Sequence, residues 1–187
     1  PAVSASYHHA SLQPGFLTGK RLINLDSEDD GIIFIGCAGG IGTKIYFDRK
    51  LENLSENDGR LFGFEVSVSG LKGGHSGDDI NRGYANAIKL LGGYLSVLQE
   101  NMPVSLLSFE GGNLHNAIPR EAVAHLAVPY REKETVRVLL NCYIADVENE
   151  FLSTDPKIRF HMESEPAATA FLPKNISASL IQFINQC

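Results

Sequence analysis

Apolar and polar residues alternate along this chain with two different periods, and the changes between them predict its elements. A period of two predicts a strand with one buried face, whereas apolar spacings of three and four predict an amphipathic helix. The segments follow one another as strand 60–71, helix 79–101, strand 104–112, strand 121–129, helix 132–152 and strand 157–163. This order predicts an α+β fold of the ferredoxin-like, split β-α-β kind, an antiparallel sheet with both helices on one face.

Further apolar segments flank this unit. Residues 21–26 and 32–40 are predicted to form short buried strands, and residues 174–186 a last helix. Residues 1–20 are rich in Ser, Pro and Gly, which predicts a loop. The flanks therefore lie outside the ferredoxin-like unit.

Composition excludes several classes of partner. The 187 residues carry a net charge of −6, and the basic residues are scattered, which argues against nucleic acid and against a membrane surface as partner. No apolar run approaches a membrane span, and the first residues lack the apolar core of a signal peptide. The cysteines lie far apart, at Cys37, Cys142 and Cys187, and are predicted to be reduced thiols. We therefore expect a cytoplasmic protein.

The first candidate for chemistry is His75 in the stretch GGHSG, between a predicted strand and a predicted helix. Glycines on both sides allow a sharp turn that would display the imidazole at its apex. The alternative is a turn whose histidine is simply solvated.

A second candidate is the stretch GGNLHNAIPRE, which contains Asn116 and Arg120. The amide of Asn116 offers a donor and an acceptor, and a guanidinium such as that of Arg120 can hold a carboxylate through two parallel hydrogen bonds. The alternative is a capped loop with a surface arginine.

The third candidate is Asp26 in NLDSEDDG, at the end of a predicted buried strand. Ligands and catalytic groups of α/β enzymes lie at such strand ends. A solvated acidic turn is the alternative explanation of this run.

Taken together, three segments resemble the aminoacyl-histidine dipeptidases (Xaa-His dipeptidases, carnosinase-like), which belong to a two-zinc metallopeptidase superfamily. The segments are LINLDSEDDGIIFIGCAGG, FEVSVSGLKGGHSGDDINRGYANAIKLL and GGNLHNAIPREA. The resemblance implies an α/β catalytic domain with an inserted lid domain that also mediates dimerisation. It implies that residues 1–31 are the edge of the catalytic domain, 32–168 the lid and 169–187 the segment returning to the catalytic domain.

The resemblance also implies roles for the candidates. His75 would reach the active site and polarise the scissile carbonyl or its oxyanion, and Asn116 would position the substrate. Arg120 would recognise a carboxylate, and Asp26 would be a ligand of one of two Zn²⁺ ions per active site. The whole protein would be a homodimeric zinc dipeptidase that hydrolyses Xaa-His dipeptides.

The sequence departs from the family in its zinc ligands. The HxD motif, the bridging aspartate, the Glu-Glu pair and the late histidine that the family needs do not occur in it. A lone Asp26 cannot hold zinc, since a catalytic site needs about three protein ligands. We therefore expect the lid with strips of the catalytic domain at both ends, inactive by itself. Two alternatives stay open, the lid of a related aminoacylase or tripeptidase, and a free-standing ferredoxin-like dimerisation module without catalysis.

Overall fold

The computed structural model describes residues 3–4, 31–32, 43–46, 50–53 and 59–186. The chain divides into two units, residues 1–48 and 49–187. In the first unit, strand β1 (Val3–Ser4) pairs antiparallel with β2 (Lys44–Ile45). All other described elements belong to the second unit.

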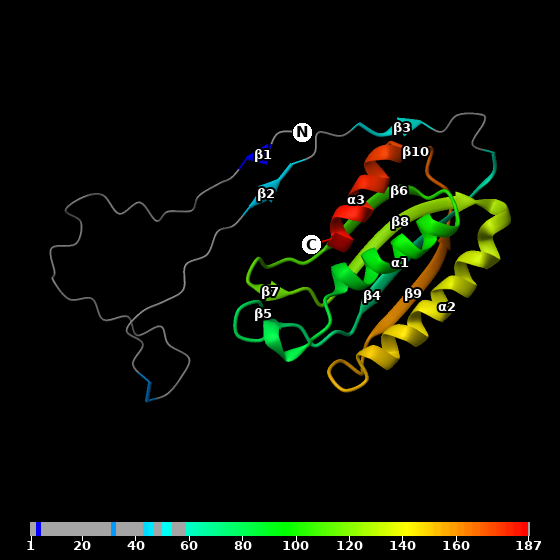
Figure 1. Ribbon diagram of the computed structural model, residues 1–187. Helices are drawn as coiled ribbons and strands as arrows, with labels where there is room; N and C mark the ends of the chain where they lie inside the picture. The colour runs from blue at the N-terminus through cyan, green and yellow to red at the C-terminus, as the bar shows by residue number, and fades with distance from the viewer. Residues whose placement is uncertain (1–2, 5–30, 33–42, 47–49, 54–58, 187) are drawn as a thin grey trace, which may run out of the picture. The chain divides into compact units, whose positions relative to one another are not determined.

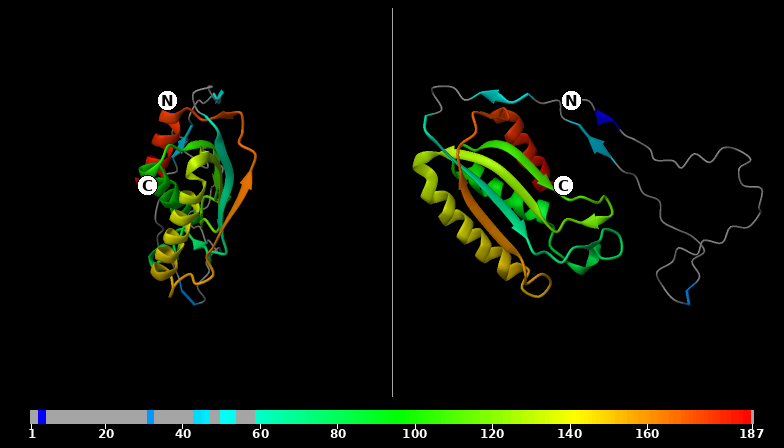
Figure 2. Two further views of the ribbon diagram at one scale, coloured as in Figure 1. Left: turned by 90° about the vertical axis from the view of Figure 1, so that its right-hand side faces the viewer. Right: turned by 180° about the vertical axis from the view of Figure 1, so that it is seen from behind.

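The second unit is built on a four-stranded antiparallel sheet with the strand order β6-β8-β4-β9 (Figure 1). The strands are β4 (Leu61–Ser69), β6 (Ser105–Gly111), β8 (Ala122–Pro129) and β9 (Arg159–Glu165). Helix α1 (Ala87–Asn101) follows β4, helix α2 (Lys133–Glu150) follows β8, and both lie on the same face of the sheet (Figure 2). Because β8 lies between β4 and β6, the β-α-β unit is split. This confirms the predicted α+β, ferredoxin-like fold.

Alternation along the strands decides which face of the sheet is covered. Phe64, Val66 and Val68 of β4 are buried under the helices, whereas Glu65 and Ser67 lie on the opposite face, called here the open face. The helix-covered side of β8 is buried in the same way, with Ala124, Leu126 and Val128. Each buried Val, Leu or Phe side chain of this face contributes roughly 1.5–3 kcal/mol. The covered face is therefore the main source of stability.

Two tyrosines join the helices to each other. The hydroxyl of Tyr94 on α1 donates to the carbonyl of Val136 at 3.0 Å, and that of Tyr143 on α2 donates to the carbonyl of Leu90 at 2.9 Å. Burial raises the pKa of Tyr94, and burial likewise raises the pKa of Tyr143 to about 12. Both hydroxyls thus stay protonated and donating across the physiological range.

The start of α1 differs from the sequence prediction, which placed it at residue 79. A short 3-10 helix, η2 (Ile80–Arg82), ends at Gly83, whose φ of 70° is left-handed. Helix α1 then starts at Ala87, where the Asn86 side chain accepts hydrogen bonds from two backbone N–H groups. Because Ile80 continued the apolar spacing of the helix, the periodicity alone could not locate this break.

The four-stranded sheet and the two helices that cover it form a two-layer sandwich, called here the sandwich. The chain enters and leaves it along adjacent paths. Strand β3 (Glu52–Asn53) pairs antiparallel with β10 (Ala170–Phe171). The backbone N–H of Leu172 then donates to the carbonyl of Leu106 on β6 at 2.8 Å. Helix α3 (Lys174–Gln186), as predicted, follows and packs on α1, where the Asn185 amide donates to the Gly92 carbonyl at 3.0 Å.

The N-terminal predictions fall mostly outside the described residues. These are the strands at 21–26 and, except for Ile32, at 32–40. In the part of the chain that the structure describes, no helix combines the length and the apolar character needed to cross a membrane.

Candidate functional site

Two glycine-rich segments far apart in the sequence meet at one end of the sheet. Strand β5 (Gly74–His75) pairs antiparallel with β7 (Ala117–Ile118), so that His75 lies opposite Ala117. The backbone N–H of Ser76 donates to the carbonyl of Asn116 at 2.9 Å. The structure therefore brings together the GGHSG and NAIP stretches, which the sequence could only single out one by one.

The loop that follows β5 determines the tautomer of the His75 imidazole. The backbone N–H groups of Gly77 and Asp78 both lie 3.2 Å from Nδ1 and donate to it. A nitrogen that accepts hydrogen bonds carries no proton, so the proton of the neutral ring lies on Nε2. The side chain is 49% exposed. His75 thus presents Nε2–H as a donor, because the hydrogen bonds from its own loop go to Nδ1 and leave Nε2–H available.

The charged form of the same ring would have a different partner. Nδ1 lies 3.5 Å from a carboxylate oxygen of Asp78, a separation that becomes an ion pair only when the imidazole is protonated. In that form Nδ1 could no longer accept from the two N–H groups. The two 3.2 Å hydrogen bonds therefore belong to the neutral ring, and the 3.5 Å contact with Asp78 would belong to the charged one.

Tight backbone contacts hold the His75 loop in place. The backbone N–H of His75 donates to Oδ2 of Asp79 at 2.8 Å, and the N–H of Asp79 donates back to the His75 carbonyl at 3.0 Å. Gly73 has a φ of 67°, and a Cβ there would lie 2.5 Å from Cγ of Arg120. Gly74, with a φ of 155°, would meet the carboxylate of Asp79. These two glycines are therefore required by close approach as well as by backbone conformation.

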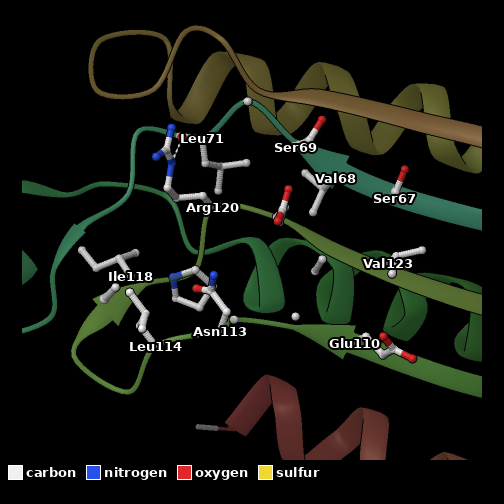
Figure 3. A pocket seen from close by; sticks show the side chains of 17 residues that line it. Ser67, Val68, Ser69, Leu71, Glu110, Asn113, Leu114, Ile118, Arg120 and Val123 are labelled. Atoms are coloured by element: carbon white, nitrogen blue, oxygen red, sulfur yellow. Dashed lines mark hydrogen bonds between the residues drawn. The ribbon is translucent and has the colours of Figure 1, made fainter.

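Arg120 lies beside this pairing and lines a pocket of about 890 Å³ (Figure 3). Its Nε donates to the carbonyl of Leu71 at 3.3 Å, which leaves the terminal nitrogens of the guanidinium as donors. Figure 3 shows Arg120 and Leu71 together at one end of the pocket, with Glu110 toward the other. Neither His75 nor Asn116 is among the residues that line it.

Asn116 is exposed, and its side chain makes no hydrogen bond to another residue of the described ranges. Its backbone carbonyl accepts the hydrogen bond from the backbone N–H of Ser76. The backbone therefore anchors Asn116 while its amide stays available to a ligand.

The proposed zinc ligand Asp26 lies outside the described residues. Within the ranges that the structure describes, no group of three His, Cys, Asp or Glu side chains could hold a metal ion. The described part of the chain thus does not by itself fit a zinc site.

Sequence reasoning missed Asp155, a buried carboxylate that ties the His75 loop to the sandwich. It accepts from the backbone N–H groups of Lys72 at 2.7 Å and Ala85 at 3.1 Å, one before and one after the loop. The signal was an Asp-Pro pair directly after a predicted helix, which is typical of turns. The partners of Asp155 lie about 70 and 83 positions away in the sequence, so no local pattern could reveal them.

A second missed feature is Tyr84 at the end of the loop. Its hydroxyl accepts from Nζ of Lys72 at 2.7 Å, and the same ammonium lies 4.0 Å from its ring centroid. Hydrogen bonds from Lys72 and then from Arg82 lower the pKa of Tyr84. Arg82 in turn pairs through Nε with Asp79 at 3.0 Å. Lys72 and Arg82 therefore link residues at the two ends of the His75 loop through contacts on its exposed side.

With this geometry established, comparison with known families defines the class of the protein. Residues 61–155 match the model of the peptidase dimerisation domain, and the chain belongs to that family. The match begins at β4 and ends at Asp155, and so covers β4, β6, β8, α1 and α2 together with the His75 loop and the β7 segment, whereas β9 follows it.

Two relatives of the chain are dipeptidases. The chain is 35% identical over 176 residues to the cytosol non-specific dipeptidase of Escherichia coli (strain K12), a match to 93% of this chain and 35% of that protein. It is also similar to the crystal structure of aminoacylhistidine dipeptidase from Vibrio alginolyticus, with a TM-score of 0.69 and 30% identity. That match covers 75% of this chain and 28% of the other. The chain thus spans about a third of the length of the dipeptidases it matches.

Proposed function

We propose that this chain is the lid and dimerisation part of a zinc-dependent dipeptidase that hydrolyses Xaa-His dipeptides. Its family and the two dipeptidase relatives support this proposal. The observation that carries it is the Nε2–H donor of His75, presented next to Asn116 by the pairing of β5 with β7.

The chemistry that this donor can perform follows from its geometry. Hydrolysis of a peptide bond places negative charge on the carbonyl oxygen in the transition state, and a fixed N–H donor stabilises that charge. The His75 ring is held by its own loop, so little reorganisation is needed when the oxygen becomes negative. A donor of this kind contributes roughly a hundred- to a thousandfold in kcat.

Asn116 and Arg120 would fix the substrate in that position. The amide of Asn116 can bind a carbonyl or carboxylate, and the terminal nitrogens of Arg120 can bind a carboxylate through two bonds. Their assignment rests on their place beside His75. Asn116 directly precedes β7 and accepts from the backbone N–H of Ser76, and Arg120 packs on Gly73.

A lid domain that is inserted into another domain has its first and last residues close together, and the pairing of β3 with β10 agrees with this. Entry strand β3 and exit strand β10 pair antiparallel, which lets the chain leave another domain and return to it nearby. We place the boundaries of the lid at residues 32 and 168. The zinc ions would be held by the catalytic domain, with Asp26 as one ligand. When bound, they supply Lewis-acid activation of the peptide carbonyl and of the attacking water.

Substrate class and location are inferred from the relatives. One relative is named a non-specific dipeptidase and the other an aminoacylhistidine dipeptidase, so a dipeptide is their shared substrate and histidine at its second position is the finer proposal. The term cytosol in the first name, together with widely spaced cysteines, supports a cytoplasmic location. Association as a homodimer is supported by the family description.

The proposal is tested by kinetics of the full-length protein with zinc and β-alanyl-histidine. Exchange His75→Ala is expected to lower kcat roughly a hundredfold to a thousandfold with a much smaller change in KM, because the donor acts on the transition state. Exchange His115→Ala, at another exposed histidine of the same end of the sheet, is the matched control.

Three further results would decide between the alternatives. Unchanged turnover in the His75→Ala variant would show a scaffold rather than a catalytic lid. Preference for an N-acyl amino acid or a tripeptide over β-alanyl-histidine would favour the aminoacylase or tripeptidase branch. Hydrolysis by the 187-residue chain alone would contradict the assignment of the zinc site to another domain.

A further inference from the structure

The carboxylate of Asp79 binds the backbone of His75 instead of capping the helix that follows it. Asp79 occupies the N-cap position of η2, where an aspartate commonly accepts a hydrogen bond from the first backbone N–H groups of the helix. Its side chain makes no capping bond of this kind. Oδ2 accepts instead from the backbone N–H of His75 at 2.8 Å. The side chain therefore serves the histidine rather than the helix.

Asp79 engages both backbone polar groups of His75. Besides the bond to Oδ2, the N–H of Asp79 donates to the His75 carbonyl at 3.0 Å, which closes the turn 75–79. The N–H groups of Gly77 and Asp78, which donate to Nδ1 of the imidazole, both belong to this turn. Opening the turn at Asp79 would therefore move the two donors that determine the tautomer of the ring.

We propose that Asp79 is the positioning residue of His75, which holds the imidazole with Nδ1 accepting and Nε2–H available, and that Arg82 keeps the Asp79 carboxylate in place. This inference deepens the proposed function and rests on it. The position of the ring affects turnover only if His75 binds the scissile carbonyl or its oxyanion.

Close packing fixes the position of the Asp79 side chain. A Cβ on Gly74 would lie 2.7 Å from Oδ2 and 2.8 Å from Cβ of Asp79, so the carboxylate packs directly on the backbone that precedes His75. The side chain of Asp79 is only 23% exposed, whereas that of the neighbouring Asp78 is 74% exposed. Of these two successive aspartates, Asp79 is therefore the one that is packed into the loop.

Arg82 balances the charge of Asp79 and binds its second carboxylate oxygen. Its Nε lies 3.0 Å from Oδ1, whereas Oδ2 accepts from His75. A hydrogen bond to a charged acceptor is stronger than one between neutral groups, so the ionised carboxylate holds the His75 N–H firmly. Arg82 is held in turn by a hydrogen bond to the Tyr84 hydroxyl, which also accepts from Lys72. Both oxygens of Asp79 thus have a fixed partner.

Asp155 acts at a different place in the same loop. Its carboxylate accepts from the backbone N–H groups of Lys72 and Ala85, where the loop joins the sandwich. Asp155 therefore attaches the loop to the sandwich, whereas Asp79 sets the backbone at the histidine itself.

The tautomer of His75 tests the inference without zinc or substrate. In long-range proton–nitrogen correlation spectra of the 187-residue chain at alkaline pH, Asp79→Ala is expected to change the ring from the Nε2–H tautomer to a mixture. Asp79→Asn should keep the Nε2–H tautomer, because its amide oxygen can still accept from the His75 N–H. Asp146→Ala, which removes an exposed carboxylate from α2, is the matched control and should leave the His75 signals unchanged.

Circular dichroism establishes first that each variant is folded. If Asp79→Ala does not fold, Asp79→Ser takes its place, because its hydroxyl lies one bond closer to the backbone than Oδ2 and still favours an N-cap position. The same mixture of tautomers is expected. A purely Nε2–H ring in the folded variant would overturn the inference.

Kinetics of the full-length protein test the consequence for turnover. Asp79→Ala is expected to lower kcat by about tenfold or more, with KM within about twofold of wild type, because a misplaced donor loses its effect on the transition state. The variant that also carries His75→Ala should be no slower than His75→Ala alone, since Asp79 acts through the ring. A second loss on top of that of His75→Ala would show a general structural role and contradict the inference.

The outcomes separate this inference from the proposed function. A mixed tautomer in Asp79→Ala together with an unchanged kcat would overturn the catalytic role of His75 and leave its positioning by Asp79 intact. An unchanged tautomer would overturn the positioning and leave the role of His75 to its own test. A mixed tautomer with a lower kcat, and no further loss in the double variant, supports both.

Discussion

The helix-covered body of the sandwich and its glycine-rich end, where β5 meets β7, are held together by different forces. The body is held by apolar side chains such as Phe64 and Leu126, which need only alternate correctly. The end is held by individual hydrogen bonds to the His75 loop and by glycines that allow close contact. The comparison teaches that stability is concentrated in the body, whereas a specific chemical geometry is concentrated at the end.

A cavity in the body should have the largest effect on stability. Exchange Phe64→Ala removes a fully buried ring and should lower the free energy of unfolding by about 3–5 kcal/mol. Urea unfolding followed by circular dichroism measures this. Val138→Ala, at a side chain that is 59% exposed on α2, should stay within about 0.5 kcal/mol of wild type. Equal losses in the two variants would remove the distinction between the regions.

Asp155 connects the two regions, so its exchange should affect both. Asp155→Asn replaces one acceptor with a donor that faces a backbone N–H, and should cost about 1.5–3 kcal/mol. It should also speed amide hydrogen exchange at Lys72 and Ala85, the two N–H groups that lose their charged partner. Asp78→Asn, at a side chain that is 74% exposed, is the control. Unchanged exchange at both amides would mean that Asp155 does not hold the loop.

Gly73→Ala should measure how much the close contact with Arg120 matters. Gly73 and Gly59 share a φ of 67°, and a left-handed alanine costs about 1–2 kcal/mol at either position. Only at Gly73 would the new Cβ collide with another side chain, since nothing lies within 4 Å at Gly59. The difference between the two variants in thermal unfolding isolates the contact. Identical losses would show that Arg120 moves away freely.

The smallest expected effect is a change in how the free energy of unfolding depends on pH above pH 10, and it comes from Tyr143 in the body. The pKa of Tyr143 is about 12 in the folded chain and about 10 in an unfolded one, so the folded state prefers the protonated hydroxyl. Its contribution to stability is therefore complete below pH 10 and is lost as the pH rises toward 12. Tyr143→Phe should flatten the fall in unfolding free energy over that window. An unchanged slope would mean that the hydroxyl is not protected.

The sequence predicts the body better than the end, for a physical reason. Periodicity reflects burial, and it located β4, β6, β8, β9, α2 and α3 to within a few residues. It failed at the start of α1, where Gly83 and Asn86 interrupt an apolar spacing. The two-residue strands β5 and β7 have no period at all, so only the glycines around His75 marked them. Asp155 escaped notice because its partners are distant in sequence.

The central claim is that the loop after β5 fixes His75 with Nδ1 accepting and Nε2–H free to donate. Long-range proton–nitrogen correlation spectra of the imidazole, recorded at alkaline pH where the ring is neutral, report this tautomer directly. The account predicts a protonated Nε2 and an unprotonated Nδ1 for His75, unlike the exposed His115, which should show a mixture. A ring that carries its proton on Nδ1 would contradict it.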